Sequence, residues 1–422
     1  MLTDTLMVYD EAISWLYSTQ KVGIKLGLES ISRLLRLLNV NAAPGPGGSP
    51  VIFHVAGTNG KGSVCAVLDA ISRAAGHRTA LFTSPHLITF RERIRLNGAM
   101  ISRQEAAEGL SRIRELVKDW NPHPTFFELT AALALDWFQR QNAEVIVLET
   151  GLGGRLDATN ALTPAVTAIT SLSLDHRQYL GDTLEAIAGE KAGIFKPGVP
   201  VVSVAQPEGA AQVLRERAQT VGAPLRWVEQ PVAQAVALAG SHQKINAALA
   251  LAALEASKLP VTREAIERGL SGVVWPGRFQ RIAGAEGVEL VLDGAHNEDA
   301  ARRLVETWHE EYPGERPILL LGVLRDKDVE AICREFAPLA AEFVAVGVKS
   351  VRACAAADLA AKVRASAPQT PCAVIATAAE GLALAQARAR ESGRRVLIAG
   401  SLFLIGEILA LLQGAEAEAS AQ

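Results

Sequence analysis

The sequence has few cysteines, few aromatic residues and no excess of charge of one sign. Its 422 residues include 4 cysteines, none in a CxxC pair or grouped with histidines, which argues against a structural zinc site or a disulfide framework. Aromatic residues make up 5%, too few for a protein that stacks bases on an aromatic platform. The formal net charge is −3, without the basic excess typical of nucleic-acid-binding proteins. We therefore expect no nucleic-acid partner.

The sequence also lacks membrane-spanning and secretory segments. No run approaches about 18 uninterrupted apolar residues, and the apolar run at 402–412 is broken by Gly406 and Glu407. The N-terminus has no basic segment followed by an apolar core, so it does not resemble a secretory signal. These absences lead us to expect no membrane partner and a location in the reducing cytoplasm.

What the sequence does contain is enough apolar material for large cores. The hydrophobic fraction is 49%, far above that of a disordered chain. A length of 422 residues at about 150 residues per domain predicts two or three domains. This composition indicates a globular protein and favours an enzyme.

Predicted strands alternate with predicted helices along the chain, which is typical of an α/β fold with a mostly parallel, doubly wound sheet. The first set of strands is predicted at 51–57, 78–83, 143–149, 165–171 and 199–204. Helices are predicted at 26–39, 103–119 and 126–141. The prolines and glycines of 42–50 should interrupt regular structure.

The same alternation restarts after the WPGRF segment at 275–279. Strands are predicted at 288–294, 317–323, 342–347 and 394–401. We therefore predict two domains, a large doubly wound domain over 1–280 and a smaller, Rossmann-like α/β domain over 281–422. The final residues, 415–422, should be frayed.

A glycine-rich loop follows the first predicted strand and precedes a helix, a position where backbone amides and a helix N-terminus attract anions. The loop consists of Gly57, Thr58, Asn59, Gly60, Lys61, Gly62 and Ser63. Lys61 would reach the β- and γ-phosphates of a nucleotide, and Ser63 would meet magnesium. The spacing differs from GxxxxGK[ST], because Gly62 separates the lysine from the serine. An ordinary glycine turn is the alternative.

Three further polar residues follow predicted strands, at the sheet edge where α/β proteins bind ligands. Ser84, Glu149 and His176 come from TSPHL, ETGLGG and LDH segments. A hydroxyl and a carboxylate, with phosphate oxygens, could hold one magnesium ion, and a histidine would mark a second metal site. The alternative is that Ser84 and His176 are helix caps or loop residues with satisfied hydrogen bonds.

The motifs GTNGKGS, TSPHL, ETGLGGRLDATN, SLDH, EKAGIFKPG, PGRF and DGAHN occur in this order between about 24 and 405. The sequence resembles the folylpolyglutamate synthase/dihydrofolate synthase family of the Mur-ligase superfamily. LDATN, EKAGIFKPG and DGAHN favour the folate branch over the peptidoglycan ligases, which usually carry an additional N-terminal domain.

The resemblance implies ATP-dependent ligation of L-glutamate to dihydropteroate, to the γ-carboxyl of folyl(poly)glutamates, or to both. An acyl phosphate would be the intermediate, and ADP and phosphate the co-products. ATP, two Mg²⁺ ions and a monovalent cation are the implied cofactors, and the family works as a monomer. Three alternatives stay open: a Mur-type ligase acting on a cell-wall nucleotide, a P-loop NTPase or kinase, and an inactive binding protein.

The resemblance also assigns residues to the nucleotide and the metals. Ser84 and Glu149 would hold one magnesium ion, and Glu149 and His176 would contact the second. Lys191 matches a lysine that is carbamylated in the family, a change that turns a cation into an anion able to support the second metal. A lysine on a helix surface is the alternative. Lys61, Lys191, His176 and Arg278 are the expected catalytic residues.

The remaining assignments concern both domains. Asn246, Arg278 and Asp293 would contact the nucleotide, and His296 either the nucleotide or the glutamate. The pterin would lie between two segments, Thr125, Phe126, Phe127 and Glu128 on one side and Leu156, Asp157 and Ala158 on the other. Core packing at a helix start is the alternative for the two phenylalanines. Because the nucleotide contacts come from both domains, we expect the domains to close and exclude water.

Overall fold

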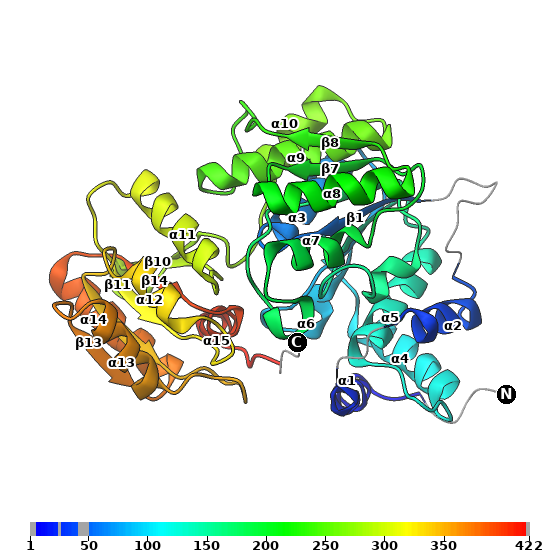
Figure 1. Cartoon of the computed structure of the whole chain (residues 1–422). Helices are drawn as coiled ribbons and strands as arrows, with labels where there is room; N and C mark the ends of the chain where they lie inside the picture. The colour runs from blue at the N-terminus through cyan, green and yellow to red at the C-terminus, as the bar shows by residue number, and fades with distance from the viewer. Residues whose placement is uncertain (1–5, 24–26, 41–49, 419–422) are drawn as a thin grey trace.

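The chain folds into two α/β units that lie side by side (Figure 1). The computed structural model describes residues 6–23, 27–40 and 50–418. The predicted break at 42–50 therefore lies outside the described residues, except for Pro50. The first residue of the helix predicted at 26–39 also lies outside them.

The first unit contains a sheet of eight strands among the described residues, in the order β4-β3-β2-β5-β1-β6-β7-β8. The strands from β2 to β8 in this order run parallel, and β3 and β4 form an antiparallel edge. All five predicted strands are confirmed, whereas β3, β4 and β8 were not predicted. The bounds are β1 (Val51–Ala56), β2 (Thr79–Phe82), β3 (Ile94–Leu96), β4 (Ala99–Met100), β5 (Val145–Glu149), β6 (Val166–Ile169), β7 (Val201–Val204) and β8 (Leu225–Val228).

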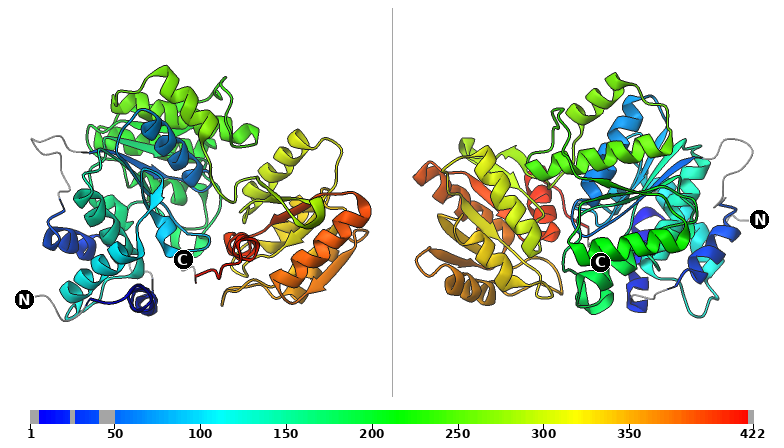
Figure 2. Two further views of the ribbon diagram at one scale, coloured as in Figure 1. Left: turned by 180° about the vertical axis from the view of Figure 1, so that it is seen from behind. Right: turned by 45° about the horizontal axis from the view of Figure 1, so that its top comes forward.

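Helices cover both faces of this sheet, which explains why its central strands are apolar on both sides (Figure 2). Phe53 and Val55 of β1 pack against α3, α9 and α10, whereas Ile52 faces α1, α2, α4 and α5. Helices α7 and α8 cover Ile169 and Val201. The bounds are α1 (Tyr9–Ser18), α2 (Glu29–Leu37), α3 (Lys61–Ala74), α4 (Arg103–Val117), α5 (Phe126–Arg140), α6 (Arg177–Leu180), α7 (Leu184–Ala192), α8 (Glu208–Val221), α9 (Ser241–Ser257) and α10 (Arg263–Gly272).

The second unit contains six strands in the order β13-β12-β11-β14-β10-β9, as far as the described residues show. Only β9 is antiparallel. Helices α11 to α13 pack on one face, and α14 and α15 on the other. The bounds are β9 (Gln280–Ala283), β10 (Glu289–Leu292), β11 (Ile318–Leu321), β12 (Glu342–Val346), β13 (Cys372–Ile375), β14 (Val396–Ala399), α11 (Glu298–Glu311), α12 (Val329–Phe336), α13 (Ala356–Ser366), α14 (Ala378–Ser392) and α15 (Leu402–Gln413).

The two sheets direct the carboxyl ends of their strands toward a shared cavity. Gly57 follows β1, Ser84 follows β2 and Glu149 ends β5, whereas Asp293 follows β10 and Ser401 follows β14; all five line this cavity. The domain boundary predicted at 280/281 stays a prediction, although β9, in the second sheet, begins at Gln280. In the part of the chain that the structure describes, every helix is too short or too polar to cross a membrane.

The expectation of a frayed C-terminus is wrong for the residues up to Glu418. The Glu418 amide donates to the carbonyl of Ile88 (2.7 Å), and its carboxylate accepts from the Phe90 amide (2.7 Å) and the Thr89 hydroxyl (3.0 Å). The partners of Glu418 belong to the first unit, so the end of the chain returns from the second unit to the first. Residues 419–422 lie outside the described residues.

Candidate active site

The glycine-rich loop opens into the cavity between the two units, and all seven of its residues, 57–63, line the cavity. Gly60 has φ of +92° and precedes α3, and a Cβ at this position would lie 2.7 Å from Asn246 Oδ1. The first backbone bond of α3 is donated by Val64 to Gly60 (2.9 Å), so the amides of Lys61, Gly62 and Ser63 belong to the free N-terminal turn. This turn is where an anion would bind.

The first part of the loop has a different role. The amides of Thr58 and Asn59 donate to the carbonyl of Ser171 (2.9 and 3.3 Å), so they are turned away from a nucleotide. Lys61 Nζ donates to the carbonyls of Gly57 (3.0 Å) and Thr58 (3.1 Å). The stretch of backbone amides that can bind phosphate, called the phosphate cradle below, is therefore shorter than predicted and starts at Gly60.

Ser84 and Glu149 meet beside this cradle. The Ser84 amide donates to Glu149 Oε2 (3.0 Å), and the Oγ atoms of Ser63 and Ser84 are buried without a hydrogen-bond partner. Burial raises the pKa of the Glu149 carboxyl, and the charge of Lys61 only partly offsets this effect. A buried carboxylate beside two orphaned hydroxyls fits a magnesium ion.

The donor set predicts how such an ion would be bound. Among the described residues no three His, Cys, Asp or Glu side chains are grouped closely enough to hold a metal by themselves. A magnesium ion at Ser84 and Glu149 would therefore complete its ligands with phosphate oxygens and water, as magnesium usually does.

His176 and Lys191 lie on the same side of the cavity. His176 occupies the N-cap position of α6 with φ of +51°, but its side chain makes no cap hydrogen bond and so does not cap the helix. Burial lowers the pKa of His176 to about 3, which keeps the imidazole neutral, the form that binds metals. Lys191 is buried in α7 and its Nζ donates to Gly57 O (2.7 Å), so it is not a surface lysine. Burial, with the charge of Lys61, lowers the pKa of Lys191 to about 7.

The second unit and α9 supply the opposite wall. Arg278, Asp293, His296 and Asn246 all line the cavity. The two Asp293 carboxylate oxygens accept from the Phe279 and Ala295 amides (both 2.9 Å), and burial raises its pKa against the influence of Arg278. His296 Nδ1 lies 2.7 Å from the carbonyl of Gly294, so Nδ1 carries the hydrogen and Nε2 points into the cavity.

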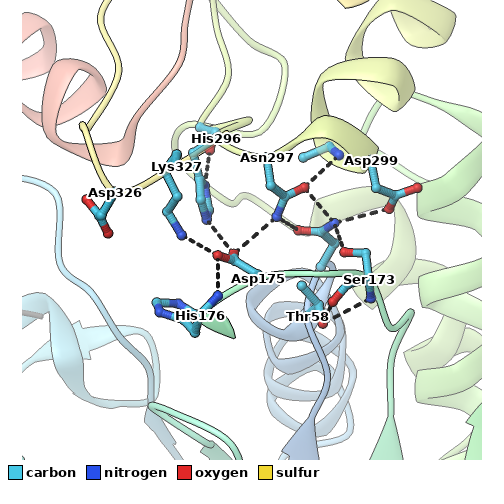
Figure 3. Close-up of polar contacts among 12 residues, drawn as sticks. Thr58, Ser173, Asp175, His176, His296, Asn297, Asp299, Asp326 and Lys327 are labelled. Carbon is cyan, nitrogen blue, oxygen red and sulfur yellow. Dashed lines mark hydrogen bonds and ion pairs between the residues drawn. The ribbon is translucent and has the colours of Figure 1, made fainter. Parts of the chain in front are cut away.

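Sequence reasoning selected His296 but missed Asp175, Asn297 and Lys327, which meet it at the domain interface (Figure 3). Asp175 is in contact with Lys327 Nζ (2.5 Å), Asn297 Nδ2 (3.3 Å) and His296 Nε2 (3.7 Å). Against the effect of burial, His296 and Lys327 hold the pKa of Asp175 well below its usual range. Lys327 follows β11, so the strand-end rule that selected Ser84 would also have selected it.

The predicted pterin segments do not line this cavity. Thr125 is the N-cap of α5, and its hydroxyl and amide both donate to Glu128 (2.9 and 2.8 Å) in a capping box. Phe126 is buried and stacks on Tyr17 with ring centroids 5.4 Å apart, as the core-packing alternative expects. The Phe127 ring lies against Gly151. A Cβ atom added at Gly151 would be only 2.5 Å from this ring.

Asp157 is buried below the turn that follows Glu149. Its Oδ2 accepts from the amides of Gly151 (2.8 Å) and Leu152 (2.9 Å), and its Oδ1 accepts from the amide (3.0 Å) and hydroxyl (2.5 Å) of Thr159. Leu156 is half-buried and Ala158 buried. All of the Asp157 contacts are internal, and they shape the turn next to the metal-site glutamate.

Known proteins share both the sequence and this architecture. The family models for the Mur ligase middle domain and the Mur ligase glutamate ligase domain match residues 55–205 and 277–402. A dihydrofolate synthase/folylpolyglutamate synthase of Bacillus subtilis (strain 168) is 35% identical over 366 residues, which are 79% of this chain and 83% of that protein.

Two solved structures extend the likeness to almost the whole chain. The structure of E. coli FolC in complex with DHPP and ADP has a TM-score of 0.85 at 30% identity, covering 96% of this chain and 98% of that one. A bifunctional folylpolyglutamate synthase/dihydrofolate synthase of Yersinia pestis, complexed with AMPPNP and Mn ion, has a TM-score of 0.84 at 30% identity, with the same coverage. The chain belongs to the dihydrofolate synthase/folylpolyglutamate synthase family of Mur ligases.

Proposed function

We propose that this chain is an ATP-dependent ligase that joins L-glutamate to dihydropteroate and to the γ-carboxyl of reduced folates. One observation carries the proposal: a phosphate-binding turn, the buried Glu149 beside the unpartnered Ser84 hydroxyl, and the buried Lys191 line a single cavity together with Arg278, Asp293 and His296. The family to which the chain belongs catalyses this reaction.

The first step is transfer of the ATP γ-phosphoryl group to the acceptor carboxylate, with ADP as the leaving group. The amides of Lys61, Gly62 and Ser63 bind and orient the phosphates, and Lys61 exchanges its loop carbonyls for phosphate oxygens. Arg278 reaches the same cavity from the domain junction and neutralises charge that develops during transfer. Asn246, beside Gly60, contacts the nucleotide, and the buried carboxylate of Asp293 does so from the second unit.

A divalent metal, when bound, neutralises phosphate charge during transfer. Ser84 and Glu149 would hold the first magnesium ion, and Glu149 with His176 would contact the second. Lys191, once carbamylated, would support the second ion; its lowered pKa favours this modification, because only the neutral amine reacts with carbon dioxide. The monovalent cation stays a prediction to which we assign no ligands.

In the second step the glutamate amine attacks the acyl carbon, phosphate leaves, and the amine loses a proton. We place His296 on the glutamate side of the cavity rather than on the nucleotide. In support, its Nε2 points toward Asp175, and burial lowers the pKa of His296 to about 4, so the imidazole can orient the substrate without carrying charge.

The acceptor ring lies between the two pterin segments, next to the Gly151 turn. Phe127 and the Gly151 backbone are in contact, and Leu156 and Ala158 come from the segment that Asp157 holds in place. The segment that carries Thr125, Phe126 and Glu128 forms the opposite side. Dihydropteroate and reduced folates share this ring, so one pocket serves both acceptors.

We expect the working unit to be a monomer, as the resemblance to the family implies. We also place the enzyme in a reducing compartment, the cytoplasm. In support, Cys65, Cys333, Cys354 and Cys372 are all free in the folded chain.

The test is phosphate release from ATP in a complete mixture and with dihydropteroate, tetrahydrofolate or L-glutamate omitted. We expect release only when glutamate and one acceptor are both present, with either acceptor sufficient. Release without either substrate would identify an NTPase, and no release would identify a binding protein. Activity with a cell-wall nucleotide but neither folate would identify the Mur-type alternative.

A further inference from the structure

Two side-chain contacts join the two units. In the first unit, each contact is made by a residue of one of the two loops that carry the phosphate and metal ligands. Asn59 lies in the phosphate loop, two residues before Lys61, and Asp175 immediately precedes His176. Both residues bond to the segment that starts α11 in the second unit. Figure 3 shows Asp175 beside Asn297 of this segment.

The first contact is a reciprocal amide pair. Asn59 Nδ2 donates to Asn297 Oδ1 (3.1 Å), and Asn297 Nδ2 donates to Asn59 Oδ1 (3.0 Å). Asn59 Nδ2 also lies 3.1 Å from Asp299 Oδ2. Asn59 Nδ2 lies 3.3 Å from Ser173 Oγ of the first unit as well. Because protein partners in both units take up its amide group, Asn59 is poorly placed to bind a nucleotide as its position in the loop predicts.

The second contact is the ion pair between Asp175 and Lys327, whose side chains are 9% and 7% exposed. A charge buried this deeply is costly without its partner, so the pair favours the arrangement in which the two units touch. Asn297 Nδ2 also donates to Asp175 Oδ2 (3.3 Å), which joins both contacts into one network.

The network also reaches the rest of the first unit. The Thr58 hydroxyl donates to the Ser173 carbonyl (3.1 Å) and accepts from the Ser173 amide (3.2 Å). The phosphate loop and the Asp175 loop are thereby held to each other as well as to α11. A displacement of the second unit would pull on both loops together.

We infer that an interdomain latch is formed by Asn59, Asp175, Asn297 and Lys327. This latch fixes the position of the second unit relative to the phosphate and metal loops. The four are positioning residues: they set the closed arrangement and do not touch the reacting atoms. Loss of the latch lowers the fraction of closed enzyme, and therefore kcat, while the nucleotide still binds to the first unit. The kinetic consequence rests on the proposed ligase function, whereas the closure itself does not.

Two substitutions isolate the latch without removing local structure. Asn297→Ser keeps a good N-cap for α11 but loses the amide donors to Asn59 and Asp175. Lys327→Met keeps an apolar stem and removes the charge. Lys362→Met, which removes an exposed ion pair with Glu330 in the same domain, is the matched control.

The experiment combines kinetics with small-angle scattering in the presence of MgADP. We expect kcat to fall about tenfold in each latch variant, because a hydrogen bond to a charged group contributes on that order to an equilibrium. The KM for ATP should stay within about twofold of wild type, and the radius of gyration should increase. The control should match wild type in all three quantities.

A double-mutant cycle separates the latch from a direct substrate role. If Lys327 acts through Asp175, Lys327→Met combined with Asp175→Asn should lose no more activity than the worse single variant. Additive losses with a raised KM for glutamate would overturn the latch and make Lys327 a substrate ligand. An unchanged radius of gyration in both latch variants would also overturn it. Because scattering needs no turnover, a failed ligase assay would leave this result intact.

Discussion

The residues around the phosphate cradle and those of the predicted pterin segments differ in how their polar atoms are satisfied. Ser63 and Ser84 have buried hydroxyls without a partner, and burial raises the pKa of Glu149. Thr125 and Glu128, by contrast, satisfy each other, and Asp157 accepts four internal hydrogen bonds.

The difference separates residues that await a ligand from residues that shape the protein. An orphaned buried polar atom costs folding free energy, and at Ser63 and Ser84, which line the cavity, a bound group can offset that cost. A side chain with every atom satisfied stabilises the fold and gains less from a ligand. Substitutions in the first group should therefore reduce activity without harming stability, and those in the second should reduce stability.

The largest effect should come from Lys61→Ala. Removing the cation that faces the transferred group should lower turnover by roughly 10³-fold, because catalysis of phosphoryl transfer depends on charge neutralisation. The melting temperature should remain at the wild-type value. Lys118→Ala, on the exposed lysine at the C-cap of α4, serves as the control in the same ligase assay. Near-normal amide formation in Lys61→Ala would refute the assignment of the loop.

Glu149→Gln should separate activity from stability most clearly. We expect turnover to fall about 10²-fold, because a metal ligand is lost. Stability should hold or increase, because a neutral amide replaces a carboxylate whose charge is disfavoured by burial. Urea unfolding of both proteins at pH 7 measures the second quantity, with Glu115→Gln as an exposed control. Marked destabilisation by Glu149→Gln would place this residue with the structural group.

Asp157→Asn should show the opposite behaviour. The amide oxygen can accept at only one of the two positions, so at least one backbone amide at the other position loses its partner, at a cost of about 2 kcal/mol in the free energy of unfolding. Asp182→Asn, at an exposed position, should cost almost nothing. If Asp157→Asn instead left stability unchanged and raised only the KM for the pterin substrate, Asp157 would join the ligand-binding group.

The titration of Lys191 should make the free energy of unfolding depend on pH. Its folded pKa, about 7, lies below the ordinary value of 10.5, so between these pH values the unfolded chain binds a proton that the folded chain lacks. In carbon-dioxide-free buffer, stability relative to Lys191→Met should therefore rise with pH across this window, by up to about 1.4 kcal/mol per pH unit. Urea titrations at pH 7, 8 and 9 measure the slope. Parallel pH profiles for the two proteins would contradict a buried, neutral Lys191.

The smallest effect should come from the α5 cap. Thr125→Ala should cost about 1 kcal/mol of unfolding free energy, the usual value for a lost N-cap, whereas Thr125→Ser should retain the cap. Thermal denaturation of the two variants distinguishes them. Equal stabilities would mean that Thr125 contributes little to the helix and is free to serve the substrate.

The nine strands predicted from the sequence are all present, because buried parallel strands form continuous apolar runs between helical segments. The strands that were missed are short or lie toward the sheet edges, such as β4 and β9, where neighbours decide pairing more than apolar pattern does. The motif likewise predicts where the phosphate loop lies in the fold, but it does not predict which residues the loop's side chains contact. That Asn59 faces Asn297 depends on how two domains dock, which no local pattern contains.

The charge distribution teaches a related lesson. A net charge of −3 excludes a broad basic surface but says nothing about a cleft. In the folded chain Arg278 and Lys327 line the same cavity as Lys61, although Lys61 is more than two hundred residues away from both in the sequence. The three cations give anionic ligands a local cationic site.

The measurement that tests the central claim most directly follows the oxygen atoms of the acceptor. A folate with ¹⁸O in its γ-carboxylate is converted with ATP and L-glutamate, and the released phosphate is analysed by mass spectrometry. If the carboxylate attacks the γ-phosphoryl group, each product amide should be accompanied by one phosphate that carries one ¹⁸O atom. Unlabelled phosphate would show that ATP cleavage does not activate the carboxylate, and would contradict the acyl-phosphate ligase that the cavity supports.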